Sequence, residues 1–128
     1  MKGMKTIALI AHDARKEDMV LFVKTHFQIL QKMRLVATGT TGKRVEETGL
    51  DVECKLSGPL GGDAQIAAMA AEGRLHGIFF FRDPLGKHPH EPDVQMLLRI
   101  CDVHNVPLAT NYATATFVLL GMDEEAEN

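Results

Sequence analysis

Short aliphatic runs alternate with amphipathic helical segments along the whole chain, and this alternation constrains the fold more than any other feature. Lys5–Ala11 and Gly77–Arg82 are rich in β-branched, aliphatic or aromatic residues, which is typical of strands buried on both faces. From Lys16 to Met33, apolar side chains recur at steps of three and four residues, the period of an amphipathic helix. The pattern therefore predicts strands and helices in regular alternation.

Five strands and five helices are predicted in this way. The strands are expected at Lys5–Ala11, Arg34–Thr38, Leu50–Leu56, Gly77–Arg82 and Val106–Thr110. The helices are expected at Lys16–Met33, Lys43–Thr48, Ala64–Glu72, Pro92–His104 and Ala113–Leu120. Asp63 is the expected N-cap of the third helix, Gly49 and Gly73 are expected to end helices, and residues 123–128 are expected to fray. Right-handed crossovers then give an α/β fold, a doubly wound, flavodoxin-like, five-stranded parallel sheet flanked by helices.

The composition is that of one globular domain spanning residues 1–128. The chain carries 14 Lys and Arg against 17 Asp and Glu, and has one Tyr, six Phe and no Trp. This mild acidity and the shortage of aromatic rings argue against a nucleic-acid partner. The longest apolar runs, Ile7–Ala11 and Ile66–Ala71, fall far short of the roughly 20 residues of a membrane span. Because Cys54 and Cys101 form no CxxC motif, we expect a reduced, cytoplasmic protein.

Polar residues follow all five predicted strands. The carboxyl ends of parallel strands meet at one rim of the sheet, where ligands bind in this fold class. The residues expected on this rim are His12, Asp13, Thr38–Gly42, Ser57–Asp63, Asp83, Lys87, His88, His90, Asp93, Thr110 and Asn111. Their convergence predicts a binding site there.

Two segments of the rim, residues 38–42 and 57–63, are rich in Gly, Ser and Thr and lead toward helix starts. Glycine lets backbone N–H groups approach an anion, hydroxyls add donors, and the helix dipole favours negative charge. Together with Lys16, one turn into the first helix, they indicate a phosphate site. The alternative is that both segments are tight turns without a ligand.

Cofactor motifs are disfavoured by their spacing. The segment Gly39–Arg44 lacks the spacing and final hydroxyl residue of a P-loop, and the chain contains no GxGxxG, which argues against ATP and NAD. The pair His88 and His90, with Asp93, offers metal-ligating residue types, but it lies on a proline-punctuated loop without a nearby cysteine. Neither a metal nor an organic cofactor is predicted.

Four carboxylates surround the predicted anion site, and they are Asp13, Asp63, Asp83 and Asp93. Each of them could cap a helix or a turn. Alternatively, one removes a proton α to a carbonyl while a neighbouring donor stabilises the developing oxyanion. The candidate donors are His12, His88 and His90. The residues alone leave both interpretations open.

Six motifs in this order resemble those of methylglyoxal synthase, and they cover about residues 5–120. They are AHD at Ala11–Asp13, ATGTTG at Ala37–Gly42, LSGPLGGD at Leu56–Asp63, FFFRDPL at Phe79–Leu85, HPHEPD at His88–Asp93 and ATN at Ala109–Asn111. The resemblance implies the fold of that family. It also implies a lyase that converts dihydroxyacetone phosphate to methylglyoxal and inorganic phosphate, without metal or organic cofactor.

The resemblance further implies a role for individual residues. Asp63 is expected to be the catalytic base and later acid, with His90 stabilising the enediolate. Three further acidic positions, expected to tune protonation and geometry, are Asp13, Asp83 and Asp93. The expected substrate-binding residues are His12, Lys16, Thr38, Gly39, Thr40, Thr41, Ser57, Gly58 and His90.

Assembly and regulation are implied in the same way. Members of the family are typically homohexamers inhibited by inorganic phosphate, often cooperatively. Some relatives carry Trp where this chain has Arg82, and longer members have a C-terminal extension with an arginine, whereas this chain has no Lys or Arg after Arg99. The same fold serves as a module of carbamoyl-phosphate synthetase and of the last enzyme of purine synthesis. The alternative function is therefore a non-catalytic, anion-binding regulatory module.

Overall fold

The computed structural model describes residues 4–86 and 94–127. Its sheet has five parallel strands in the order β3-β2-β1-β4-β5. The strands are β1 (Thr6–Ala11), β2 (Arg34–Ala37), β3 (Glu53–Cys54), β4 (Gly77–Phe81) and β5 (Leu108–Ala109). The helices are α1 (Lys16–Thr25), α2 (Phe27–Leu30), α3 (Gly39–Glu46), α4 (Gly62–Ala71), α5 (Val94–His104) and α6 (Tyr112–Glu127), with 3-10 turns η1 (Asp13–Arg15) and η2 (Gly58–Leu60).

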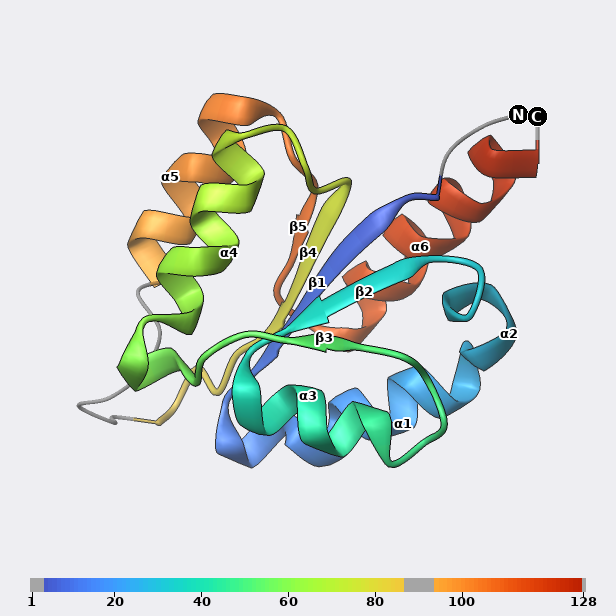
Figure 1. Ribbon diagram of the computed structural model, residues 1–128, viewed down its shortest axis with the longest axis horizontal. Coiled ribbons are helices and arrows are strands. Elements are labelled where there is room, and N and C mark those ends of the chain that lie inside the picture. The colour runs from blue at the N-terminus through green and yellow to red at the C-terminus, as the bar shows by residue number, and fades with distance from the viewer. Residues whose placement is uncertain (1–3, 87–93, 128) are drawn as a thin grey trace.

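The two central strands are buried on both faces. Every residue of β1 and of β4 is buried, as their aliphatic and aromatic sequences predict. Successive side chains of a strand point to opposite faces. Accordingly, Ile7 and Leu9 pack in the core under α1, α3 and α6, whereas Ala8 and Ile10 pack in the core under α4 and α5. Figure 1 shows these two helical layers on opposite sides of the sheet.

The strand order creates a switch point between β1 and β4. The chain runs outward from β1 through β2 to β3, and then returns to the other side of β1 for β4 and β5. The helix that follows β1 covers one face and the helix that follows β4 covers the other (Figure 1). The connections therefore diverge beyond Ala11 and Phe81, which pair in the sheet. Ligands of open α/β sheets bind in such a crevice.

The predicted fold class is confirmed, because the sheet is parallel, five-stranded and flanked by helices on both faces. The strand order refines the flavodoxin-like description. Flavodoxins have the order 2-1-3-4-5, whereas the order here is 3-2-1-4-5, as in the first five strands of dinucleotide-binding sheets. Both orders place a switch point at the carboxyl ends of the strands.

Three predicted boundaries are wrong: the start of α3, and the lengths of the strands β3 and β5. The Gly39–Gly42 segment, expected to be a loop, is the first turn of α3, because the Gly42 N–H donates to the Thr38 carbonyl at 2.7 Å. The strand expected at Leu50–Leu56 is only β3, which pairs with two residues of β2. The strand expected at Val106–Thr110 is likewise only β5. Both shortened strands are edge strands with a partner on one side only.

Two helical predictions also need correction, one at the end of the last helix and one inside the first. Residues 123–127 of the expected frayed tail are part of α6, and Asn128 lies outside the described residues. The last turns of α6 are tied down where Lys32 Nζ lies 2.9 Å from Asp123 Oδ1 and Lys5 Nζ lies 3.6 Å from Glu125 Oε1. The single helix expected over residues 16–33 is interrupted at His26, whose φ of −110° and ψ of 27° separate α1 from α2. Neither α6 nor any other helix within the described ranges is long and apolar enough to cross a bilayer.

Candidate active site

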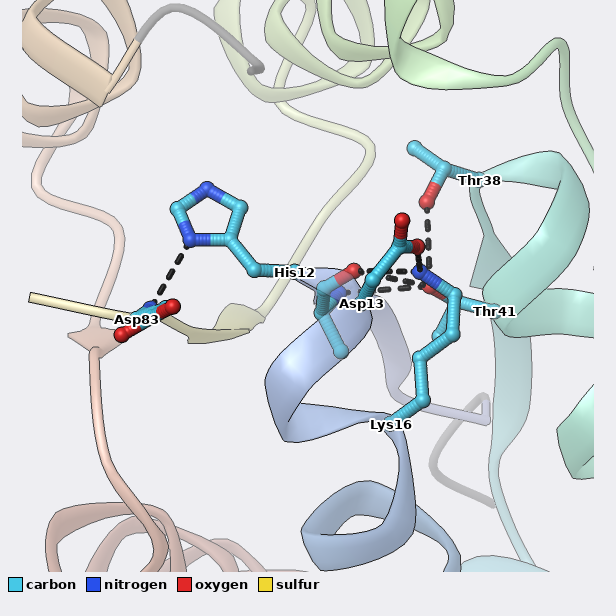
Figure 2. A network of polar contacts seen from close by, with 7 residues as sticks. His12, Asp13, Lys16, Thr38, Thr41 and Asp83 are labelled. Carbon is cyan, nitrogen blue, oxygen red and sulfur yellow. Dashed lines mark hydrogen bonds and ion pairs between the residues drawn. The ribbon is translucent and has the colours of Figure 1, made fainter. Parts of the chain in front are cut away.

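His12 occupies the switch point itself. It follows β1 directly, and its backbone N–H donates to the Phe81 carbonyl at the end of β4, 3.1 Å away. Its side chain is 6% exposed, and the ring packs edge-on against Phe80 with centroids 5.1 Å apart. Nδ1 of the ring accepts a hydrogen bond from the Asp83 backbone N–H at 2.8 Å (Figure 2). The imidazole is therefore held in one orientation by the neighbouring strand.

Asp83 makes two contacts at the site, one through its side chain and one through its backbone N–H. Its carboxylate Oδ1 accepts a hydrogen bond from the Leu85 N–H at 3.2 Å, which closes the turn after β4. The side chain thus caps the turn, which is the capping role that the sequence left open for all four carboxylates. The backbone N–H orients His12. In this structure Asp83 acts on the imidazole through its peptide group.

Lys16 lies at the start of α1 and points back toward β1. Its Nζ lies 2.8 Å from Asp13 Oδ1 and donates to the Ala11 carbonyl at 2.9 Å (Figure 2). The Lys16 side chain is 12% exposed, whereas the Asp13 carboxylate is 96% exposed. The aliphatic part of the Lys16 side chain is thus buried, and its ammonium group lies at the rim. Such an ammonium group can bind an anion in place of the exposed Asp13 carboxylate.

The threonines divide into buried and exposed members. Thr41 is 1% exposed, and its Oγ1 accepts from the Ala11 N–H at 3.3 Å and donates to the Ala11 carbonyl at 3.4 Å. Thr38 is also buried, and its hydroxyl donates to Thr41 Oγ1 at 3.4 Å (Figure 2). Thr40 is exposed. The buried pair fastens the start of α3 to the end of β1, whereas Thr40 is exposed at the N-terminus of this helix, the end that favours anions.

The segment Ser57–Asp63 lies against the start of α3. The Gly39 N–H donates to the Leu56 carbonyl at 3.2 Å, and a Cβ on Gly39 would lie 3.2 Å from the Ser57 nitrogen. The Gly62 N–H donates to the Ser57 carbonyl at 3.0 Å, which folds the segment back on itself through η2. The two Gly-rich segments that the sequence singled out are therefore brought together.

Asp63 lies in the first turn of α4 and is half-buried. The expected N-cap role is wrong, because Gly61, with φ of +103°, occupies the cap position and no side chain caps the helix. The carboxylate Oδ1 instead accepts from the Ala64 N–H at 3.0 Å. A left-handed residue before the helix suits glycine, and it turns the chain so that Asp63 enters α4 next to the Ser57 turn.

Four predicted rim residues lie outside the described residues, and they are Lys87, His88, His90 and Asp93. Among the remaining ones, Asn111 caps α6, since its Oδ1 accepts from the Thr114 N–H at 2.9 Å, and the Thr110 carbonyl accepts from the Arg82 N–H at 3.4 Å. Within residues 4–86 and 94–127, no three His, Cys, Asp or Glu side chains are grouped so that they could hold a metal ion.

Two residues at the site were missed. Arg15 Nε donates to the Arg82 carbonyl at 3.2 Å, and Gln65 Oε1 accepts from the Leu56 N–H at 2.9 Å. Arg15 braces the turn after β4, and Gln65 braces the segment before η2. Arg15 acts on the backbone of a segment far away in the sequence, and Gln65 acts on a segment nine residues earlier that η2 folds back toward α4. No local pattern marks either residue; only their closeness to His12 and Asp63 in the sequence could have suggested them.

A family model described as an MGS-like domain matches residues 18–110. The curated methylglyoxal synthase of Moorella thermoacetica is 58% identical over 123 residues, which is 95% of this chain and 96% of that protein. That of Borrelia garinii subsp. bavariensis is 56% identical over 120 residues, or 93% of this chain and 95% of that protein. This chain belongs to the methylglyoxal synthase family. The resemblance found in the sequence motifs is confirmed.

A solved structure agrees with this membership. The crystal structure of methylglyoxal synthase from Elizabethkingia anophelis superposes with a TM-score of 0.87 at 48% sequence identity, covering 91% of this chain and 77% of that one. The family model begins at Asp18, so it starts after His12, Asp13 and Lys16, whereas the curated methylglyoxal synthases cover nearly the whole chain. Membership in the methylglyoxal synthase family therefore extends to the segment that carries these three residues.

Proposed function

We propose that this chain eliminates phosphate from dihydroxyacetone phosphate and releases methylglyoxal and inorganic phosphate, as a carbon–oxygen lyase. One observation carries the proposal beyond family membership. The hydrogen bond from the Gly39 N–H to the Leu56 carbonyl, 3.2 Å long, joins the anion-binding start of α3 to the segment that presents Asp63. A phosphate held at α3 would therefore place the rest of a three-carbon substrate next to a carboxylate.

The reaction begins with proton removal by Asp63. The carboxylate takes a proton from the hydroxymethyl carbon of dihydroxyacetone phosphate, and the electron pair moves to the ketone oxygen to give an enediolate. His12 and His90 donate hydrogen bonds to the oxygen on which charge develops. His12 is buried and rigidly oriented, which supports this role, and His90 enters by the family resemblance.

Phosphate elimination completes the reaction. The enediolate collapses with cleavage of the bond between carbon and the bridging oxygen, and phosphate leaves with both bonding electrons. The resulting enol takes up a proton at its methylene carbon and becomes methylglyoxal. Substrate atoms are fully accounted for by the two products, so no water and no redox partner is consumed. Asp63 returns its proton during the second half of the sequence.

Phosphate is held by the remaining residues of the rim. Lys16 supplies the positive charge and Thr40 a hydroxyl, while Ser57 and Gly58 offer a hydroxyl and a backbone N–H at the neighbouring turn. The resemblance also implies three further substrate-binding residues, Thr38, Gly39 and Thr41. They are proposed to hold the phosphate-binding residues in position, since both threonines are buried and the Gly39 N–H bonds to the Leu56 carbonyl. Asp13, Asp83 and Asp93 are proposed to orient their neighbours rather than to take the substrate proton.

The test is an assay of methylglyoxal and inorganic phosphate during incubation with dihydroxyacetone phosphate. Asp63→Asn keeps an oxygen for the Ala64 N–H, so the fold and phosphate binding should survive. An amide cannot accept the substrate proton, and both product release and solvent proton exchange into the substrate should fall at least about a hundredfold. Wild-type exchange in Asp63→Asn would place the base elsewhere, and phosphate binding without turnover in the native chain would favour the regulatory-module alternative.

Assembly and location complete the proposal. We propose a cytoplasmic homohexamer that inorganic phosphate inhibits, on the grounds of family membership. Closed symmetric assemblies are the rule for such oligomers. Light scattering at working protein concentration should give a mass well above the 14.1 kDa of one chain, and a monomer would contradict the proposal.

A further inference from the structure

The peptide group between Arg82 and Asp83 is hydrogen-bonded at both of its ends. Its carbonyl accepts from Arg15 Nε at 3.2 Å, and its N–H donates to His12 Nδ1 at 2.8 Å. A guanidinium, a peptide and an imidazole are thus connected in series across the switch point. Arg15 is itself held in place by two further contacts, since its N–H donates to the His12 carbonyl at 2.8 Å and its Nη1 lies 3.2 Å from Asp18 Oδ2.

The bond at His12 fixes the tautomer of the ring. A nitrogen that accepts a hydrogen bond from an N–H carries no hydrogen, so the neutral ring holds its hydrogen on Nε2. Nε2 is fully buried. Protonating Nδ1 would set two N–H groups against each other at 2.8 Å, which penalises the imidazolium. The geometry therefore favours a neutral imidazole with its donor on Nε2.

Arg15 strengthens this preference. A cation at the carbonyl polarises the peptide and makes its N–H a stronger donor to Nδ1. The same positive charge, placed beyond the peptide, opposes a second positive charge on the ring. Among the residues that the structure describes, the other charged groups in the turns and first helical turns at this end of the sheet are Asp13, Lys16, Glu17, Asp18, Asp63, Arg82 and Asp83.

We propose that Arg15 is a positioning residue that, through the Arg82–Asp83 peptide, holds His12 as a neutral Nε2–H donor for the oxygen on which charge develops. The inference rests on the proposed function only for the identity of that oxygen. The tautomer and its dependence on Arg15 follow from the hydrogen bonds alone, so they are testable without substrate.

The first test reads the ring directly. Long-range ¹H–¹⁵N correlation spectra of the full chain, recorded across pH, should show His12 with its hydrogen on Nε2. In Arg15→Met a second tautomer should appear, and protonation of His12 should occur at a pH higher by on the order of one unit. Arg15→Lys should fall between the two, since it keeps the charge. Asp18→Asn is the matched control, because it removes the other partner of Arg15 and should leave the His12 spectrum unchanged.

The second test is kinetic. The acid limb of kcat/KM for dihydroxyacetone phosphate should move to higher pH in Arg15→Met by the same amount as the His12 protonation, and should stay in place in Asp18→Asn. A purely structural role for Arg15 would lower activity at every pH without moving the limb. His12→Gln, which can retain a donor near the Nε2 position, should keep more activity than His12→Asn, which can retain only the acceptor.

The two hypotheses fail in different ways. A hydrogen on Nδ1 in the native spectrum, or an Arg15→Met spectrum identical to the native one, overturns the inference even if the chain turns over its substrate. If no methylglyoxal forms while the spectra behave as expected, the proposed function is rejected and the coupling of Arg15 to His12 stands.

Discussion

Lys16 Nζ lies 2.8 Å from the Asp13 carboxylate and 2.9 Å from the Ala11 carbonyl, and the two contacts differ in kind. The carbonyl lies at the buried end of β1, whereas the carboxylate is almost fully exposed. A bound phosphate can replace the carboxylate without moving the amine, because the carbonyl keeps it in place. We therefore infer that Lys16 is positioned for an anion before one arrives.

Replacing Lys16 should weaken the binding of substrate and of inorganic phosphate together. Lys16→Met keeps the apolar stem and removes the charge, and one charge-assisted contact of this kind is worth about tenfold or more in affinity. Calorimetric titration with phosphate and KM for dihydroxyacetone phosphate should change by a similar factor. Lys24→Met, on the exposed face of the same helix, should change neither. A loss of substrate affinity with phosphate inhibition unchanged contradicts the assignment.

The segment before α4 depends on the absence of a side chain at Gly62. A Cβ there would lie 1.8 Å from the Leu56 carbonyl oxygen, which belongs to a backbone that is itself bonded to Gly39. We expect Gly62→Ala to lower the free energy of unfolding by on the order of 2 kcal/mol or more and to remove most activity, because Asp63 moves with the helix start. Urea denaturation and the methylglyoxal assay measure the two effects.

Gly121→Ala is the matched control for this change. Gly121 lies inside α6, and a Cβ there would meet nothing within 4 Å. Alanine is the better helix former by about 0.5–1 kcal/mol, so this variant should be slightly more stable and fully active. Equal effects of the two substitutions would show that crowding at Leu56 does not determine the position of Asp63.

The order of strands and helices could be predicted because it depends on local patterns. The buried runs of β1 and β4 are continuous and apolar, and the period of α1 is plain in the sequence. The start of α3 could not be placed, because it depends on the Gly39 N–H finding the Leu56 carbonyl from a later segment. The last turns of α6 likewise depend on Lys32 and Lys5, which lie about a hundred residues earlier in the chain.

The placement of polar residues on one rim of the sheet was predictable for a related reason. Parallel strands bring their carboxyl ends together, so His12, Asp63 and Asp83 could be assigned to one rim without coordinates. What sequence could not supply is which atom of each residue acts. Asp83 reaches His12 through its backbone N–H, and Thr41 is buried under the rim. These distinctions arise from packing between segments that are distant in the chain.

Stability at alkaline pH should report on Cys101, which is 2% exposed in the core under α4 and α5. Burial raises the pKa of its thiol to about 11, from a reference of 9.0. Between these values the unfolded chain has lost the thiol proton and the folded chain retains it, so the folded state binds more protons and stability falls as pH rises. The loss from this thiol should reach about 2 kcal/mol near pH 10.5. Urea denaturation under reducing conditions at pH 8 and pH 10.5 measures it.

Cys101→Ala should be less stable at both pH values because of the cavity, yet should lack this part of the alkaline decline, whereas Cys54→Ser should retain it. An alkaline decline that is the same in Cys101→Ala and in the native chain would assign it to other groups.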